Sequence, residues 1–182
     1  MKLHFRTLAL PLVALALALT GCGSDKPATD DPNFIAFNDY ESVLGWQPDM
    51  NAVTREQAHS GKYSVVVNGG KEFAMGYALP IGKATARRPH TIKIKAWAFM
   101  TDAKSTARLG VLVREPGTNK EIYGDGIDFK GAVQDPKKWV EISKNIVLPA
   151  TINSSQELCV FLWRGNAESP AYLDDLSITL VD

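Results

Sequence analysis

Hydrophobic and polar residues alternate with a period of two along most of this chain. The clearest stretch is TIKIKAWAFM at residues 91–100, where Ile92 and Ile94 fall on one face and Lys93 and Lys95 on the other. Such alternation is typical of a β-strand with one buried face. No long segment repeats its hydrophobic residues with the 3.6-residue period of a helix. The pattern therefore predicts a chain built from strands.

The same period predicts further short strands, separated by turn sequences rich in Gly, Asn and Pro. They cover residues 54–57, 63–68, 73–79, 108–115, 121–129, 139–148, 157–164 and 172–180. Short strands without helices between them leave no room for parallel crossovers. We therefore expect an all-β fold, an antiparallel two-sheet β-sandwich of about 8–10 strands. No repeat or change of composition divides residues 34–182, which are expected to form one domain.

The N-terminal segment has a different character. It reads MKLHFRTLALPLVALALALTGC, with Lys2 and Arg6 followed by an apolar run that stops just before Cys22. The run is too short to cross a bilayer and has the order of a secretory signal peptide. Its end, Leu-Thr-Gly-Cys, resembles the bacterial lipobox, in which cleavage exposes a cysteine that becomes lipidated. The alternative is an ordinary signal peptide beside a chance cysteine.

We therefore expect residues 1–21 to be a lipoprotein signal peptide and Cys22 to anchor the protein to a membrane of the bacterial cell envelope, on its periplasmic or outer surface. Residues 22–33 are rich in Asp, Pro and small polar residues, which predicts a flexible tether. Loss of the signal peptide would remove two of 20 cationic residues and none of 20 acidic ones, which changes the formal charge from 0 to −2. Nothing here predicts a nucleic-acid partner.

Catalytic chemistry has little support in the sequence. Only His59 and His90 lie beyond the signal peptide, and neither belongs to a nucleophile or metal-binding motif. Asp174 and Asp175 are adjacent in AYLDDLSI, a predicted strand, so they are expected to point to opposite faces, with Asp174 facing the same way as Leu176. A buried carboxylate on that face needs a partner. No catalytic residue is predicted.

Five motifs follow one another in an order that resembles a known family. They are FNDYES at 37–42, HSGKYSV at 59–65, KIKAWAF at 93–99, WVEISKNIVLPA at 139–150 and LCVFLWRGNAESPAYLDDLSI at 158–178. Together they resemble the jelly-roll carbohydrate-binding modules of the cellulose- and xylan-binding type, which are galactose-binding-like sandwiches. The resemblance covers nearly all of residues 34–182. It implies a jelly-roll fold that binds carbohydrate without catalysis.

The resemblance also implies a structural Ca²⁺ between the two ends of the domain. Oxygen atoms of carboxylates and carbonyl groups are the ligands that Ca²⁺ takes. Carried onto this chain, the ligand positions are Glu41, the turn residues Ser60 and Lys62, and Asp174 or Asp175. The alternative is that these acids pair with Lys62 or with backbone N–H groups of a turn, without a metal.

Sugar-binding sites combine exposed aromatic rings with a few hydrogen-bonding side chains. The strand alternation places several rings on polar faces, although each tryptophan could instead belong to the core. Arg108 and Arg114 are expected to line the same outer sheet surface as Trp97. No Asn or Gln is prominent on these strands. The predicted carbohydrate contacts are Trp97, Trp139, Trp163, Tyr123 and Arg114.

The function favoured by these observations is a non-catalytic, lipid-anchored protein of the cell envelope that binds a polysaccharide or oligosaccharide by aromatic stacking. The alternative is an adaptor or structural lipoprotein of the same fold that binds another envelope protein through an apolar face. A flat patch joining Trp97 and Trp163 would favour the adaptor. A hollow lined by rings and polar groups would favour the sugar.

Overall fold

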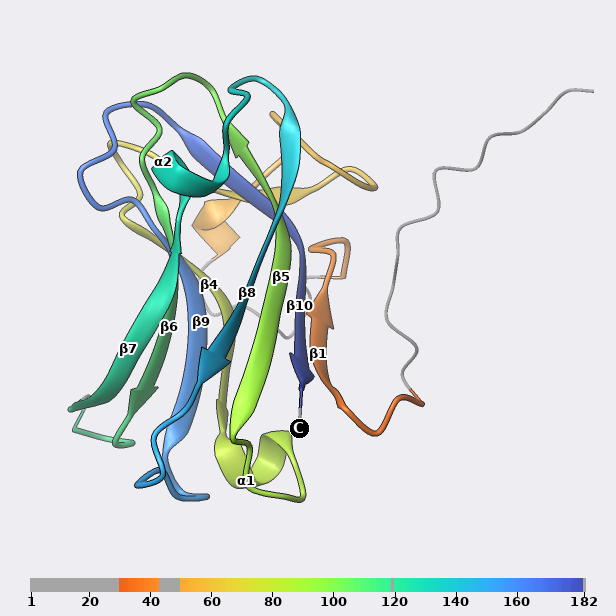
Figure 1. Cartoon of the computed structure of the whole chain (residues 1–182). Coiled ribbons are helices and arrows are strands. Elements are labelled where there is room, and N and C mark those ends of the chain that lie inside the picture. Colours follow the sequence, from red (N-terminus) through yellow and green to blue (C-terminus); the bar gives the residue numbers. More distant parts are fainter. Residues whose placement is uncertain (1–29, 43–49, 119, 182) are drawn as a thin grey trace, which may run out of the picture.

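Two antiparallel sheets packed face to face form the domain (Figure 1). The computed structural model describes residues 30–42, 50–118 and 120–181. The predicted β-sandwich is confirmed, with ten strands in the described chain. The strands are β1 (Phe34–Asn38), β2 (Val53–Thr54), β3 (Ser64–Val67), β4 (Phe73–Pro80), β5 (Thr91–Met100), β6 (Arg108–Arg114), β7 (Glu121–Asp128), β8 (Trp139–Val147), β9 (Glu157–Trp163) and β10 (Ala171–Leu180).

One sheet has six strands in the order β2-β3-β10-β5-β8, with β1 paired to β10 as well, and the other has four in the order β4-β9-β6-β7. Within the described ranges, two helices of four residues each, α1 (Ile81–Ala84) and α2 (Phe129–Ala132), lie at opposite ends of the sandwich (Figure 1). A 3₁₀ turn, η1 (Met50–Ala52), precedes β2. None of the described helices is long and apolar enough to span a membrane.

The core lies between the sheets and follows the alternation of the sequence. In β5 the side chains of Ile92, Ile94, Ala96 and Ala98 are fully buried, as the period of two predicts. They meet the inward-facing residues of the other sheet, and both sets belong to one continuous hydrophobic cluster. Full burial of each Leu or Ile side chain contributes about 1.5–3 kcal/mol. The inward residues of β6 and β9 are Leu109, Val111, Val113, Leu158, Val160 and Leu162.

Strand β10 contains a bulge that the sequence did not predict. Its register with β5 shifts between Asp174 and Ser177, and Asp175 has a φ of 48°. In a regular strand one residue separates two side chains that face the core. Because of the extra residue of the bulge, Leu173 and Leu176 both face the core although two residues separate them. The expectation that the two carboxylates point apart, with Asp174 facing the same way as Leu176, is therefore wrong.

Strands β1 and β3 share one edge of β10. Strand β3 pairs with residues 171–173 and β1 with residues 176–179, so the bulge falls between the two partners. The first described strand thus lies beside the last, so the two ends of the domain meet along one edge of β10. The strand predicted at residues 54–57 ends at Thr54, and residues 55–62 form a loop instead.

Candidate functional site

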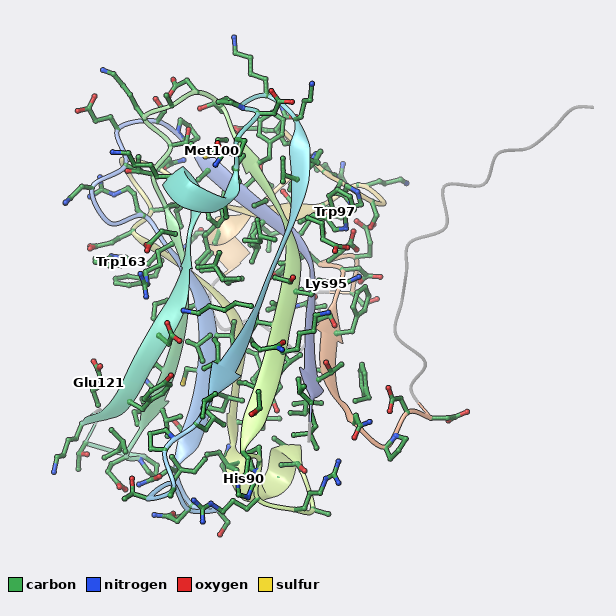
Figure 2. The ribbon with its side chains drawn as sticks, viewed as in Figure 1. His90, Lys95, Trp97, Met100, Glu121 and Trp163 are labelled. Carbon is green, nitrogen blue, oxygen red and sulfur yellow. The ribbon has the colours of Figure 1, made fainter. Side chains whose placement is uncertain are left out.

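The predicted aromatic contacts lie on two opposite faces of the sandwich. Trp97 and Trp139 belong to β5 and β8 of the six-stranded sheet, whereas Trp163 belongs to β9 of the four-stranded sheet. Figure 2 shows the labelled Trp97 and Trp163 on opposite sides of the molecule. Arg108 and Arg114 share the sheet of Trp163, so the expectation that they line the same surface as Trp97 is wrong.

On the six-stranded sheet, the aromatic rings pack against one another under the loop at residues 55–62. The imidazole of His59 stacks on Trp97 with ring centroids 3.8 Å apart and lies edge-on to Trp139 at 5.8 Å. Trp139 also packs against Phe99, which is itself buried against Tyr172. A sugar stacks on the open face of a ring, and one face of Trp97 already carries His59. This surface is better described as a second, smaller hydrophobic cluster.

On the four-stranded sheet, by contrast, two rings are open to solvent. Phe73 is 53% exposed and Trp163 is 38% exposed, and they are direct neighbours across β4 and β9. Their planes are parallel within 9°, with centroids 6.3 Å apart, and Phe161 meets Phe73 edge-on at 6.0 Å. The Nε1–H of Trp163 donates to the carboxylate of Glu72 at 3.3 Å, which limits rotation of the indole. These rings form an apolar surface of the kind that the C–H face of a pyranose covers.

A pocket adjoins Trp163 at the end of the sheet that leads into α2. It is lined by Thr106, Arg108, Asp128, Trp163, Gly165 and Asn166. Arg108 is the direct neighbour of Trp163 across β6 and β9. Arg114, which the sequence analysis favoured, lies six residues further along β6, about 20 Å away, beside Glu157.

The exposed amide of Asn166 was missed by the sequence analysis because it follows the strand in a loop. Residues 164–170 are fastened to the neighbouring loop of residues 101–105 by a bond from Thr101 Oγ1 to the carbonyl of Pro170 at 3.1 Å and by three further contacts. Lys104 Nζ pairs with Glu168 at 2.7 Å, Glu168 N donates to the carbonyl of Lys104 at 3.1 Å, and Ser169 Oγ donates to Asp102 at 2.8 Å. These contacts hold the loop that carries Asn166 at the mouth of the pocket.

The guanidinium of Arg108 is held by acids on the neighbouring strand. Both oxygens of Asp128 accept bonds from Arg108 Nη1 at 2.8 Å, and Asp125 lies 3.9 Å from Nη2. Asp125 also accepts a 2.6 Å bond from Lys144 of the other sheet. Burial opposes ionisation of Asp125, but the bonds from Lys144 and from the Gly126 N–H outweigh it and lower the pKa of Asp125. Arg108 is thus presented in a fixed orientation and with its charge balanced.

Glycines allow these side chains to lie flat on the sheet. A Cβ at Gly110 would lie 2.8 Å from the ring of Phe161, and a Cβ at Gly126 would lie 2.9 Å from Nε of Arg108. A larger residue at Gly110 would lift the Phe161 ring away from the sheet, and one at Gly126 would also collide with the carbonyl oxygen of Leu109, 2.3 Å from the added Cβ.

Tyr123 does not belong to this surface. It pairs across the strands with Val113, an inward-facing residue, and it packs partly against the core. Its hydroxyl donates to Asp125 at 3.4 Å. The prediction that Tyr123 lines the outer face is therefore wrong, because the outward positions of β7 are those that pair with Leu112 and Gly110, and they are occupied by Gly124 and Gly126.

The three acidic residues predicted to bind Ca²⁺, Glu41, Asp174 and Asp175, pack against a turn formed by residues 59–63. Asp174 and Asp175 both bond to His59 and Ser60, and Glu41 bonds to the backbone N–H groups of Lys62 and Tyr63. Ser60 and Lys62 thus present N–H and O–H groups to the carboxylates. Within the described ranges, no three His, Cys, Asp or Glu side chains form a group that could hold a metal ion. The groups that face these carboxylates are N–H and O–H donors, whereas Ca²⁺ takes oxygen ligands, so this donor set does not fit Ca²⁺.

Asp174 is fully buried, and its ionisation is opposed by its surroundings. Burial, and then the neighbouring charge of Asp175, raise the pKa of Asp174 to about 7, although three backbone N–H groups favour the ionised form. The remaining predicted site residue, Cys22, lies outside the described residues.

A β-sandwich with a ring-lined pocket beside hydrogen-bonding side chains has the architecture of a carbohydrate-binding module. The sequence of residues 33–168 matches the CBM_4_9 family, a carbohydrate binding domain. The protein belongs to this family, which confirms the resemblance seen in the motifs. A search of curated proteins finds no significant match.

Solved structures of carbohydrate-binding modules have the same fold. The CBM22-1 xylan-binding domain from Paenibacillus barcinonensis Xyn10C superimposes with a TM-score of 0.54 at 21% identity, over 82% of this chain and 96% of that one. A family 16 carbohydrate binding module gives 0.52 at 20% identity, over 80% and 99%. The C-terminal family 22 module of Clostridium thermocellum Xyn10B gives 0.52 at 14% identity, over 83% and 95%.

The raised pKa of Asp174 predicts a pH dependence of stability. Between about pH 4 and pH 7 the unfolded chain loses the proton of this carboxyl while the folded protein keeps it, so this group lowers the free energy of unfolding as pH rises. The slope is at most about 1.4 kcal/mol per pH unit. We expect Asp174→Asn to remove this decline, measured by urea unfolding at several pH values. Parallel pH curves for the two proteins would contradict the assignment.

Proposed function

We propose that this protein is a non-catalytic, lipid-anchored binding protein of the bacterial cell envelope, and that it holds a polysaccharide or oligosaccharide at the pocket beside Trp163. The observation that carries the proposal is the open pair of rings, Trp163 and Phe73, next to a pocket with fixed polar groups. One sugar ring would stack on Trp163 while its hydroxyls bond to Arg108, Asp128 and Asn166.

The charges of the pocket favour an uncharged glycan. Arg108 is neutralised by Asp128, both of whose oxygens accept bonds from Nη1, so neither a carboxylate-bearing nor an amino sugar gains a net attraction. The pair still offers a donor and an acceptor side by side, which suits two neighbouring hydroxyl groups. Among the neighbours in fold, the CBM22-1 domain from Paenibacillus barcinonensis Xyn10C is described as xylan-binding, so xylan is the first glycan to test.

The competing function, an adaptor that binds another envelope protein, has less support. It would require one flat apolar patch that joins Trp97 and Trp163, and these residues belong to different sheets. A hollow lined by a ring, an amide and an ion pair favours a small polar ligand over a flat protein surface.

We expect Trp163→Ala to weaken binding to soluble xylan at least tenfold, because stacking on this ring contributes most of the apolar contact. Trp97→Ala is the matched control, since it removes the same ring from the covered face and should change affinity less than twofold. Affinity electrophoresis and calorimetry measure both. A loss of affinity in Trp97→Ala with none in Trp163→Ala would contradict the proposed site.

The anchor is tested separately. We expect the wild-type protein to fractionate with membranes and to incorporate labelled fatty acid, and we expect Cys22→Ser to abolish both. A Cys159→Ser variant is the control, because that thiol is buried in the sandwich. Membrane association that persists in Cys22→Ser would contradict lipidation at this residue.

A further inference from the structure

The turn at residues 59–63 directs its backbone N–H groups toward the acidic residues. The N–H groups of His59 and Ser60 donate to one oxygen of Asp174 at 2.8 and 3.2 Å. Those of Lys62 and Tyr63 donate to one oxygen of Glu41, both at 2.7 Å. Two successive N–H groups that converge on one oxygen form a nest, a backbone arrangement that binds anions.

Side chains complete the coordination of the carboxylates. Asp175 accepts a 2.8 Å bond from Ser60 Oγ and makes a 2.6 Å contact with Nδ1 of His59. The second oxygen of Asp174 accepts the N–H of Asp175 at 2.8 Å. Both oxygens of Asp174 and of Asp175 therefore have a partner, and every partner is an N–H or O–H donor or the imidazole.

A divalent cation needs the opposite polarity. Ca²⁺ takes six to eight oxygen ligands at about 2.3–2.6 Å, usually with backbone carbonyls among them. Here the positive ends of four peptide dipoles face the carboxylates, at the side where the cation would have to lie.

The turn also leaves no space for an ion between Glu41 and the backbone. Gly61 has a φ of 57°, and a Cβ added there would lie only 2.3 Å from the carboxyl carbon of Glu41. The carboxylate therefore rests directly against the turn. Glycine at this position provides both the left-handed backbone conformation and the close approach.

We propose that the two ends of this domain are joined without a metal, by a clamp in which the turn at 59–63 binds Glu41, Asp174 and Asp175 through its own N–H, hydroxyl and imidazole groups. The clamp links the segment after β1 to β10. The family resemblance would assign this linking role to a structural Ca²⁺. His59 also connects the clamp to the ring cluster through its stack on Trp97. This inference does not depend on glycan binding.

The first test is the melting temperature of the purified protein at pH 7.5 with 1 mM CaCl₂ and with 1 mM EDTA. We expect a difference below 1 °C, and no binding of Ca²⁺ by calorimetry. A site with a micromolar dissociation constant would instead raise the melting temperature by roughly 8 °C in 1 mM Ca²⁺. A calcium-dependent increase of that size would overturn the proposal.

A pair of variants tests the clamp itself. Glu41→Gln keeps an oxygen that can accept the N–H groups of Lys62 and Tyr63, so its melting temperature should fall by no more than about 2 °C. Glu41→Ala leaves both N–H groups without that partner, so its melting temperature should fall by several degrees. If the melting temperature of Glu41→Gln in EDTA is as low as that of Glu41→Ala, the proposed clamp is contradicted. This measurement is made without glycan, so its outcome is independent of the proposed function.

Discussion

The structure depends on how the bulge in β10 satisfies two adjacent buried carboxylates. Strands β3 and β1 pair with different halves of β10, and neither pairs with Asp174 or Asp175, which lie between the two halves. The segment that packs against this edge of β10 must therefore supply their hydrogen-bond donors. A buried carboxylate without donors would cost several kcal/mol. The turn at 59–63 supplies the donors, and in doing so it crosses the outer face of the six-stranded sheet, where His59 stacks on Trp97.

That crossing decides which face of the sandwich is available to a ligand. The loop that carries His59 covers one face of Trp97 and brings Trp139 into a packed cluster. Among the residues that the structure describes, none covers Trp163 and Phe73 on the other sheet in this way, and both rings are open beside the pocket. The stability of the domain and the location of its candidate site are therefore linked through one turn.

The alternation of the sequence predicted the strands and the two-sheet sandwich, because the inward side of each strand is set by a local period. A local period does not determine which sheet a strand joins, which is why Arg108 and Arg114 are expected on the surface of Trp97 and lie instead on that of Trp163. The bulge at Asp175 reversed the alternation on one side of β10, and no local signal marked it. The role of Asn166 could not be predicted from a local pattern, because the position of its loop is fixed by contacts between residues distant in sequence, such as Lys104 with Glu168.

The central claim is that ligand binds at the open face of the four-stranded sheet. An NMR titration with a xylo-oligosaccharide, following the indole N–H signals of the tryptophans, tests it most directly. Binding at the pocket should shift the signal of Trp163, whose N–H lies beside Glu72, and leave those of Trp97 and Trp139 in place. Shifts confined to Trp97 and Trp139 would contradict the claim.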